Sequence, residues 1–187
     1  RGLADDVEID RIGNVIATRK ARLQGSGRRV MFAAHMDEVG LIITGIKDDG
    51  TLSYDTVGSV DPRTVVSKRV FVGEKALPGA IGAKAIHLQS REDLARALTH
   101  DKLSIDIGAK DKASAEKLVS VGDCATFDGE WREFGEGLVR ARALDDRVGV
   151  YNCLRLLAGE YPCDVVCAFT VAEEIGCGAG AACHGAD

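Results

Sequence analysis

The first residues that could do chemistry are His35 and Asp37, which come directly after the apolar run 30–34. A short, continuous apolar run predicts a buried central strand. Residues two apart in a strand point the same way, so His35 and Asp37 are expected to share a face. A metal-binding imidazole needs a carboxylate or carbonyl partner on its other ring nitrogen, which Asp37 could supply. The alternative is a hydrogen-bonded pair or a loop cap without a metal.

The acidic pair Asp145 and Asp146 is the second candidate. It follows the strand-like segment 138–141 and lies in the first turn of a stretch whose apolar residues recur at helical spacing. Aspartate suits both the cap and the positive end of the helix dipole. The pair therefore has two interpretations, an N-terminal cap or a metal ligand.

Glu173 and Glu174 form the third candidate, at the end of the apolar run 164–171. Adjacent carboxylates in such a place are electrostatically unfavourable unless a positive charge neutralises them. A metal cluster would do so, with one glutamate as a ligand and the other available for proton transfer. A solvated turn is the alternative.

The elements that position these residues are predicted from hydrophobic periodicity. Residues 6–19 alternate in the manner of a hairpin, broken by a turn at Gly13 and Asn14. A helix over 144–157 is followed by a buried strand over 164–171, which indicates parallel strands joined by a right-handed crossover. His35 and the two glutamates would then lie at the carboxyl ends of two buried strands, where open α/β sheets hold their sites.

The middle of the chain has a different sequence pattern, in which short β-rich runs are separated by turns that contain glycine. The clearest of these turns is Asp48-Asp49-Gly50. We therefore predict an α/β fold class in two segments, residues 1–42 and 139–187. A separate β-rich domain over residues 43–138 is expected to interrupt them.

Composition excludes several classes of function. The 187 residues carry a net charge of −5 without a basic block, which disfavours a nucleic-acid partner. The apolar runs are of strand length, far short of the roughly 20 residues that a membrane span needs. The six cysteines form no Cys-x-x-Cys pair, so we expect reduced thiols in a cytoplasmic protein.

Taken together, these motifs resemble the tetrahedral aminopeptidases, a family of dinuclear metallo-aminopeptidases that includes the glutamyl aminopeptidases. The resemblance runs over nearly the whole chain. Its strongest parts are the segments 35–40, 61–64, 78–84, 105–109, 144–147 and 173–176.

The resemblance implies a role for each candidate residue. His35 resembles the ligand of one metal ion and Glu174 the ligand of the other, and Asp145 resembles the carboxylate that bridges them. Asp37 is similar to the residue that orients the histidine, and Glu173 to the general base. Two divalent ions, zinc or cobalt, are the implied cofactors.

The resemblance also implies an architecture and an assembly. Family members have a mixed-sheet catalytic domain interrupted by a β-rich, barrel-like dimerisation domain. They assemble into hollow tetrahedral dodecamers in the cytoplasm and trim short peptides. We expect the same of this protein, with no nucleic-acid or membrane partner.

The sequence departs from the family pattern at its end. In the family, an aspartate after the next strand and a histidine near the end of a much longer chain complete the site. This sequence stops at Asp187 and starts short of the family's typical N-terminal helical segment, so we expect a chain truncated at both ends. With two protein ligands per ion, such a fragment would be poorly metallated and inactive.

Two alternatives to an aminopeptidase remain open. A related dinuclear deacylase or carboxypeptidase would use the same constellation, but such enzymes usually place their extra domain later in the chain. The other alternative is an inactive assembly fragment that lacks the C-terminal metal ligands.

Overall fold

The computed structural model describes residues 2–25, 27–92 and 96–176. They form two compact units. One consists of the residues up to Glu38 together with those from Ala143 onward, and the other is Val39–Arg142. The first unit is a mixed sheet with a helix, and the second contains a closed six-stranded barrel. The predicted fold class, a mixed α/β chain interrupted by a barrel-like β-rich part, is confirmed.

The sheet of the α/β unit combines antiparallel and parallel neighbours. Its strands in spatial order are β1 (Asp6–Ile9), β2 (Val15–Arg19), β12 (Asp164–Thr170) and β3 (Arg29–His35). The hairpin predicted over residues 6–19 is confirmed as the antiparallel pair β1–β2. The parallel arrangement predicted for the two apolar strands is also confirmed. In that pair Thr170 lies opposite His35, so β3 and β12 end at the same level.

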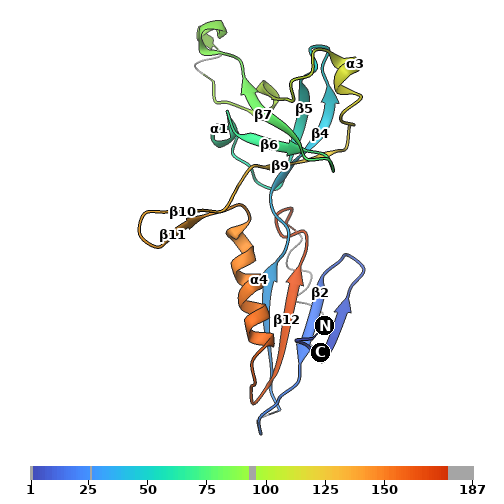
Figure 1. Cartoon of the computed structure of the whole chain (residues 1–187), viewed down its shortest axis with the longest axis vertical. Coiled ribbons are helices and arrows are strands. Elements are labelled where there is room, and N and C mark those ends of the chain that lie inside the picture. The colour runs from blue at the N-terminus through green and yellow to red at the C-terminus, as the bar shows by residue number, and fades with distance from the viewer. Residues whose placement is uncertain (1, 26, 93–95, 177–187) are drawn as a thin grey trace. The chain divides into compact units, whose positions relative to one another are not determined.

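The two apolar strands differ in burial. β12 lies between β2 and β3, and every residue after Asp164 in it is buried. The prediction of a buried central strand is wrong for β3, which is an edge strand among the described residues and leaves Val30 and Phe32 more than a third exposed. Helix α4 (Leu144–Leu157) packs against β3 and β12 (Figure 1), and its Cys153 and Leu157 join the core of this unit.

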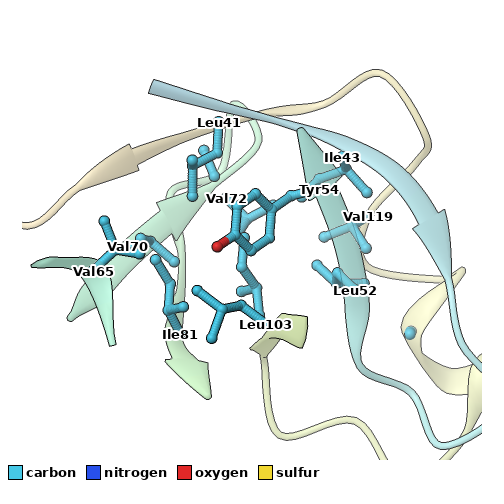
Figure 2. Close-up of a cluster of buried hydrophobic side chains, with 13 residues drawn as sticks. Leu41, Ile43, Leu52, Tyr54, Val65, Val70, Val72, Ile81, Leu103 and Val119 are labelled. Atoms are coloured by element: carbon cyan, nitrogen blue, oxygen red, sulfur yellow. The ribbon is translucent and has the colours of Figure 1, made fainter. Parts of the chain in front are cut away.

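The second unit is organised around the barrel. Its strands in order are β4 (Gly40–Ile46), β5 (Leu52–Val57), β8 (Leu103–Asp106), β7 (Leu77–Ala83), β6 (Arg69–Val72) and β9 (Cys124–Phe127). Aliphatic side chains from these strands, together with Tyr54, meet in its interior (Figure 2). The turn predicted at residues 48–50 joins β4 to β5, and Gly50 adopts the positive φ of 82° that this turn requires.

Short elements complete the second unit. They are α1 (Pro62–Val65), the 3₁₀ turns η1 (Ile86–Leu88) and η2 (His100–Lys102), α3 (Lys112–Ala115), and the hairpin of β10 (Arg132–Phe134) and β11 (Leu138–Arg140). Within the described parts of the chain, no helix is long and apolar enough to cross a bilayer.

Candidate metal centre

His35 is the last residue of β3, and its side chain is largely buried. Its ring nitrogen Nδ1 lies 3.1 Å from the backbone carbonyl oxygen of Asp37. A carbonyl oxygen can only accept a hydrogen bond, so Nδ1 carries the proton and donates. The neutral form of the ring therefore leaves Nε2 as the nitrogen that can bind a metal.

Asp37 contacts His35 in a different way from the one that strand alternation predicts. Its carboxylate oxygen Oδ1 is 3.6 Å from Nδ1, beyond hydrogen-bond range, and the backbone carbonyl serves as the partner. The reason is that β3 ends at His35, so the regular alternation of a strand no longer applies two residues later. The Asp37 carboxylate instead accepts hydrogen bonds from the backbone N–H groups of Glu173 and Glu174, at 3.2 and 3.1 Å.

Asp145 and Asp146 lie at the start of α4 and have separate partners. Neither has helical φ and ψ angles, so the regular helix begins after them. Periodicity instead predicts that the pair lies in the first turn of the helix. Asp146 caps the helix, because its Oδ1 accepts a hydrogen bond from the backbone N–H of Gly149 at 3.0 Å. Asp145 takes no part in this cap, and its Oδ1 lies 3.1 Å from His35 Nε2.

Glu173 and Glu174 follow β12 after a sharp change of direction at Ala172, which has a φ of 64°. The Glu173 carboxylate oxygen Oε2 lies 3.9 Å from His35 Nε2. The potential ligand atoms of His35, Glu173 and Glu174 all lie within 4.8 Å of one another. Among the described residues, Asp145 stands outside this group of three, although its carboxylate contacts His35 directly.

The charges of the cluster favour a cation. Burial alone would lower the pKa of His35. The hydrogen bonds to Asp145 and to the Asp37 carbonyl, with the negative charge of Glu173, outweigh burial and raise that pKa above its ordinary value of 6.5. The pKa of the Glu174 carboxyl is also raised, first by burial and then by the charge of Glu173. An imidazole nitrogen with carboxylate oxygens is a ligand set that suits zinc and similar divalent ions.

One residue near this site carries no predicted role beyond the hairpin turn. Asn14 is only 1% exposed, and its side-chain oxygen accepts a hydrogen bond from the backbone N–H of Val171 at 2.8 Å. The sequence offers a signal for a turn at Gly13 and Asn14, but that signal does not indicate which distant backbone group the asparagine binds.

Comparison with known proteins shows that the chain is similar to aminopeptidases. Lysyl aminopeptidase of Pyrococcus furiosus is 32% identical over 182 residues, which cover 94% of this chain and 51% of that protein. The structure of an aminopeptidase from the archaeon Desulfurococcus kamchatkensis matches 99% of this chain and 51% of its own, with 38% identity and a TM-score of 0.86. The TET1 peptidase of Pyrococcus horikoshii matches 93% of this chain and 53% of its own, with 39% identity and a TM-score of 0.77.

The chain spans about half the length of each of these relatives, although the similarity extends over nearly all of the chain itself. The sequence model of the M42 glutamyl aminopeptidases matches residues 13–186. The chain therefore belongs to the M42 glutamyl aminopeptidase family, as the resemblance of its motifs predicts.

Proposed function

We propose that this chain contributes metal ligands and a general base to a dinuclear metallo-aminopeptidase. The observation that carries the proposal is the contact between His35 Nε2 and Asp145 Oδ1 at 3.1 Å. Because Nδ1 already donates to the Asp37 carbonyl, Nε2 of a neutral imidazole would carry a lone pair. That lone pair would point at the Asp145 carboxylate oxygen and repel it. A positive charge removes that repulsion, and either a proton or a metal ion can supply it. Two further carboxylates near the same imidazole, those of Glu173 and Glu174, favour the metal ion.

The proposed ligand assignment follows from this geometry and from the family. Members of the family use dinuclear metal centres. We assign His35 to one ion, Glu174 to the other, and Asp145 to a bridge between them. Zinc and cobalt are the proposed metals, since both suit imidazole and carboxylate ligands.

Different residues of the chain would have different roles in peptide hydrolysis. When bound, two divalent ions supply the Lewis acidity that polarises a peptide carbonyl and activates water. Glu173, whose side chain is about half exposed and close to His35, is placed to take the proton from the attacking water. It would then return that proton to the leaving amine. The Asp37 carbonyl keeps the imidazole in the tautomer that leaves Nε2 available.

The proposed substrates are short peptides with a free amino terminus. The relatives are named for removing different residues, lysyl in one case and glutamyl in the family description. The shared feature of these names is cleavage at the amino-terminal residue, and the proposal for this chain rests on that feature.

We also propose that the barrel unit provides a contact between subunits. TET homologues assemble into dodecamers, and the TET1 peptidase of Pyrococcus horikoshii can form a tetrahedron or a large octahedral shell. Multi-angle light scattering should give a mass that is a multiple of that of one chain. A monomer at every concentration tested would contradict this part of the proposal.

The enzymatic proposal is tested by hydrolysis assays on the metal-loaded protein. A chromogenic amino-acid amide is compared with its N-acetylated form and with a peptide that is blocked at its amino end and free at its carboxyl end. Hydrolysis that needs both added metal and a free amino group supports the aminopeptidase. Metal-dependent removal of the acetyl group or of a C-terminal residue would favour the deacylase or carboxypeptidase alternative. Metal binding without any hydrolysis would favour the inactive assembly fragment.

A further inference from the structure

The turn that carries Glu173 and Glu174 is held largely by side chains from other parts of the chain. β12 ends at Thr170, so the backbone N–H groups that follow have no partner within the strand ladder. The N–H of Val171 donates to Asn14 Oδ1 at 2.8 Å. Those of Glu173 and Glu174 donate to the two carboxylate oxygens of Asp37. Side-chain partners thus satisfy three of the four backbone amides from residue 171 to residue 174.

The two partners lie on opposite sides of β12. Asn14 directly precedes β2, which pairs with one edge of β12. Asp37 follows β3, which pairs with the other edge. The segment after β12 is therefore hydrogen-bonded by residues that flank both neighbouring strands. These bonds lie around Ala172, which adopts a left-handed conformation. A conformation of that kind persists when the surrounding contacts determine it.

Asn14 is itself fixed by Asp10. The Asn14 side-chain amide donates to Asp10 Oδ2 at 2.8 Å, which orients its oxygen toward Val171. Asp10 Oδ1 accepts the backbone N–H groups of Ile12, Gly13 and Asn14. Both ends of the Asn14 amide are thus satisfied in a site that is nearly inaccessible to water.

Neighbouring carboxylates repel each other, so a free turn would tend to move Glu173 and Glu174 apart and toward solvent. We infer that Asn14 and the Asp37 carboxylate together form a clamp that fixes the turn 171–174 and holds both glutamates beside His35 before any metal binds. In this arrangement Asn14 is a positioning residue, since it acts through the backbone of the turn. The inference rests on the proposed metal site, but it concerns the metal-free protein.

The first test is amide hydrogen exchange of the metal-free chain, read by NMR. The amides of Val171, Glu173 and Glu174 should be protected to within about tenfold of strand amides such as that of Cys167, because each has a defined acceptor. Exchange of these three at the rate of an unstructured peptide would overturn the inference.

The second test separates positioning from general stability. Asn14→Ala should speed exchange at Val171 and Glu173 by at least about tenfold, and should weaken zinc binding by about 10–100-fold, the usual effect of losing a supporting contact. The matched control is Val165→Ala, a buried site at the far end of β12. It should lower the melting temperature and leave zinc affinity unchanged. Equal loss of zinc affinity in both variants would refute a positioning role.

A conservative variant guards against misfolding. Asn14→Asp combined with Asp10→Asn keeps the side-chain hydrogen bond between the two residues and an oxygen at residue 14 that can accept from Val171, so this double variant should restore at least part of the turn's protection even where Asn14→Ala does not fold. Failure to restore any would contradict the clamp. The outcomes also separate the two proposals: protected amides without hydrolysis support the clamp alone, and hydrolysis with unprotected amides supports the enzyme alone.

Discussion

At the scale of single residues, the adjacent aspartates Asp145 and Asp146 have distinct tasks. Asp146 satisfies a backbone amide of α4, whereas the side chain of Asp145 is 92% exposed and contacts His35. A cap and a ligand were competing interpretations of one pair, and the structure supports the cap for Asp146 only. The separation is possible because neither residue has helical backbone angles.

The division between these aspartates predicts opposite effects of removing each one. Asp146→Ala should lower the free energy of unfolding by about 1 kcal/mol through loss of the cap, with little change in zinc affinity. Asp145→Ala should weaken zinc binding strongly and change stability little, because its side chain is exposed. Urea denaturation and zinc titration of both variants measure these effects. The reverse pattern would mean that the roles are exchanged.

The paired glutamates allow a similar comparison in a preparation that hydrolyses peptides. Glu173→Gln should retain the metal and lose about 10²–10⁴-fold in activity, the usual contribution of a positioned general base. Glu174→Gln should instead lose metal, since an amide oxygen is a much weaker ligand than a carboxylate. Metal content by mass spectrometry distinguishes the two. If both variants lose metal equally, the assignment of base and ligand is wrong.

The sequence predicts the residues of this site better than their contacts. Residue type and order single out His35 and the two acidic pairs, whereas the choice of Asp145 and Glu174 within those pairs is what the family resemblance implies. The backbone carbonyl of Asp37 cannot be foreseen as the partner of His35, because it depends on where β3 ends. The Asn14–Val171 hydrogen bond joins residues 157 positions apart, so no local pattern can indicate it.

At the scale of elements, similar sequences have different environments. The apolar runs in β3 and β12 look alike, yet only β12 has strands on both sides. Local composition identifies each as a strand, but its place in the sheet depends on pairing with distant segments. Helix α4 and the first hairpin are predictable because periodicity and turn residues specify them locally.

One residue of the barrel provides a pH-dependent test of its core. The Tyr54 hydroxyl donates to His100 Nδ1 at 3.0 Å, since the other ring nitrogen of His100 donates to the Val60 carbonyl. Burial raises the pKa of Tyr54 from its ordinary value of 10.0 to about 12. The unfolded chain therefore releases this proton first, so the stability due to Tyr54 is complete below pH 10 and is lost as pH rises to about 12.

Absorbance titration of tyrosinate should show this delayed ionisation in the native protein. The control is Tyr54→Phe, which should remove the step near pH 12 and leave the remaining tyrosine signal in place. If Tyr54→Phe instead reduces the absorbance change near pH 10 and leaves the curve near pH 12 unaltered, Tyr54 is accessible to water.

At the scale of the whole molecule, the residues that the structure describes form two separate hydrophobic cores. One lies in the barrel and the other between α4 and the mixed sheet. All five candidate metal-site residues belong to the α/β unit, although residues 39–142 separate them in the sequence. The inserted barrel unit thus leaves the candidate site within the α/β unit. The change from α/β to β-rich sequence patterns and back along the chain already suggests this.

The independence of the two cores predicts that barrel mutations spare the metal site. Ile105 is fully buried in the barrel, so Ile105→Ala should lower the stability of that unit by about 2–5 kcal/mol. Zinc affinity should remain within about twofold of the unmodified chain, because no ligand lies in the barrel. Thermal unfolding and zinc titration of one sample provide both values. A parallel loss of zinc binding would show that the two units are energetically coupled.

The central claim is that His35 and its carboxylate neighbours bind a divalent metal, and calorimetric titration of the metal-free chain with zinc tests it most directly. The unmodified chain should bind zinc weakly but saturably, because each ion has two protein ligands from it. Binding should release protons, because zinc displaces the proton that His35, with its raised pKa, holds in the metal-free chain. His35→Ala should abolish that binding and the associated proton release while the fold, checked by circular dichroism, is retained. Equal zinc binding by the unmodified chain and a folded His35→Ala variant would contradict the account.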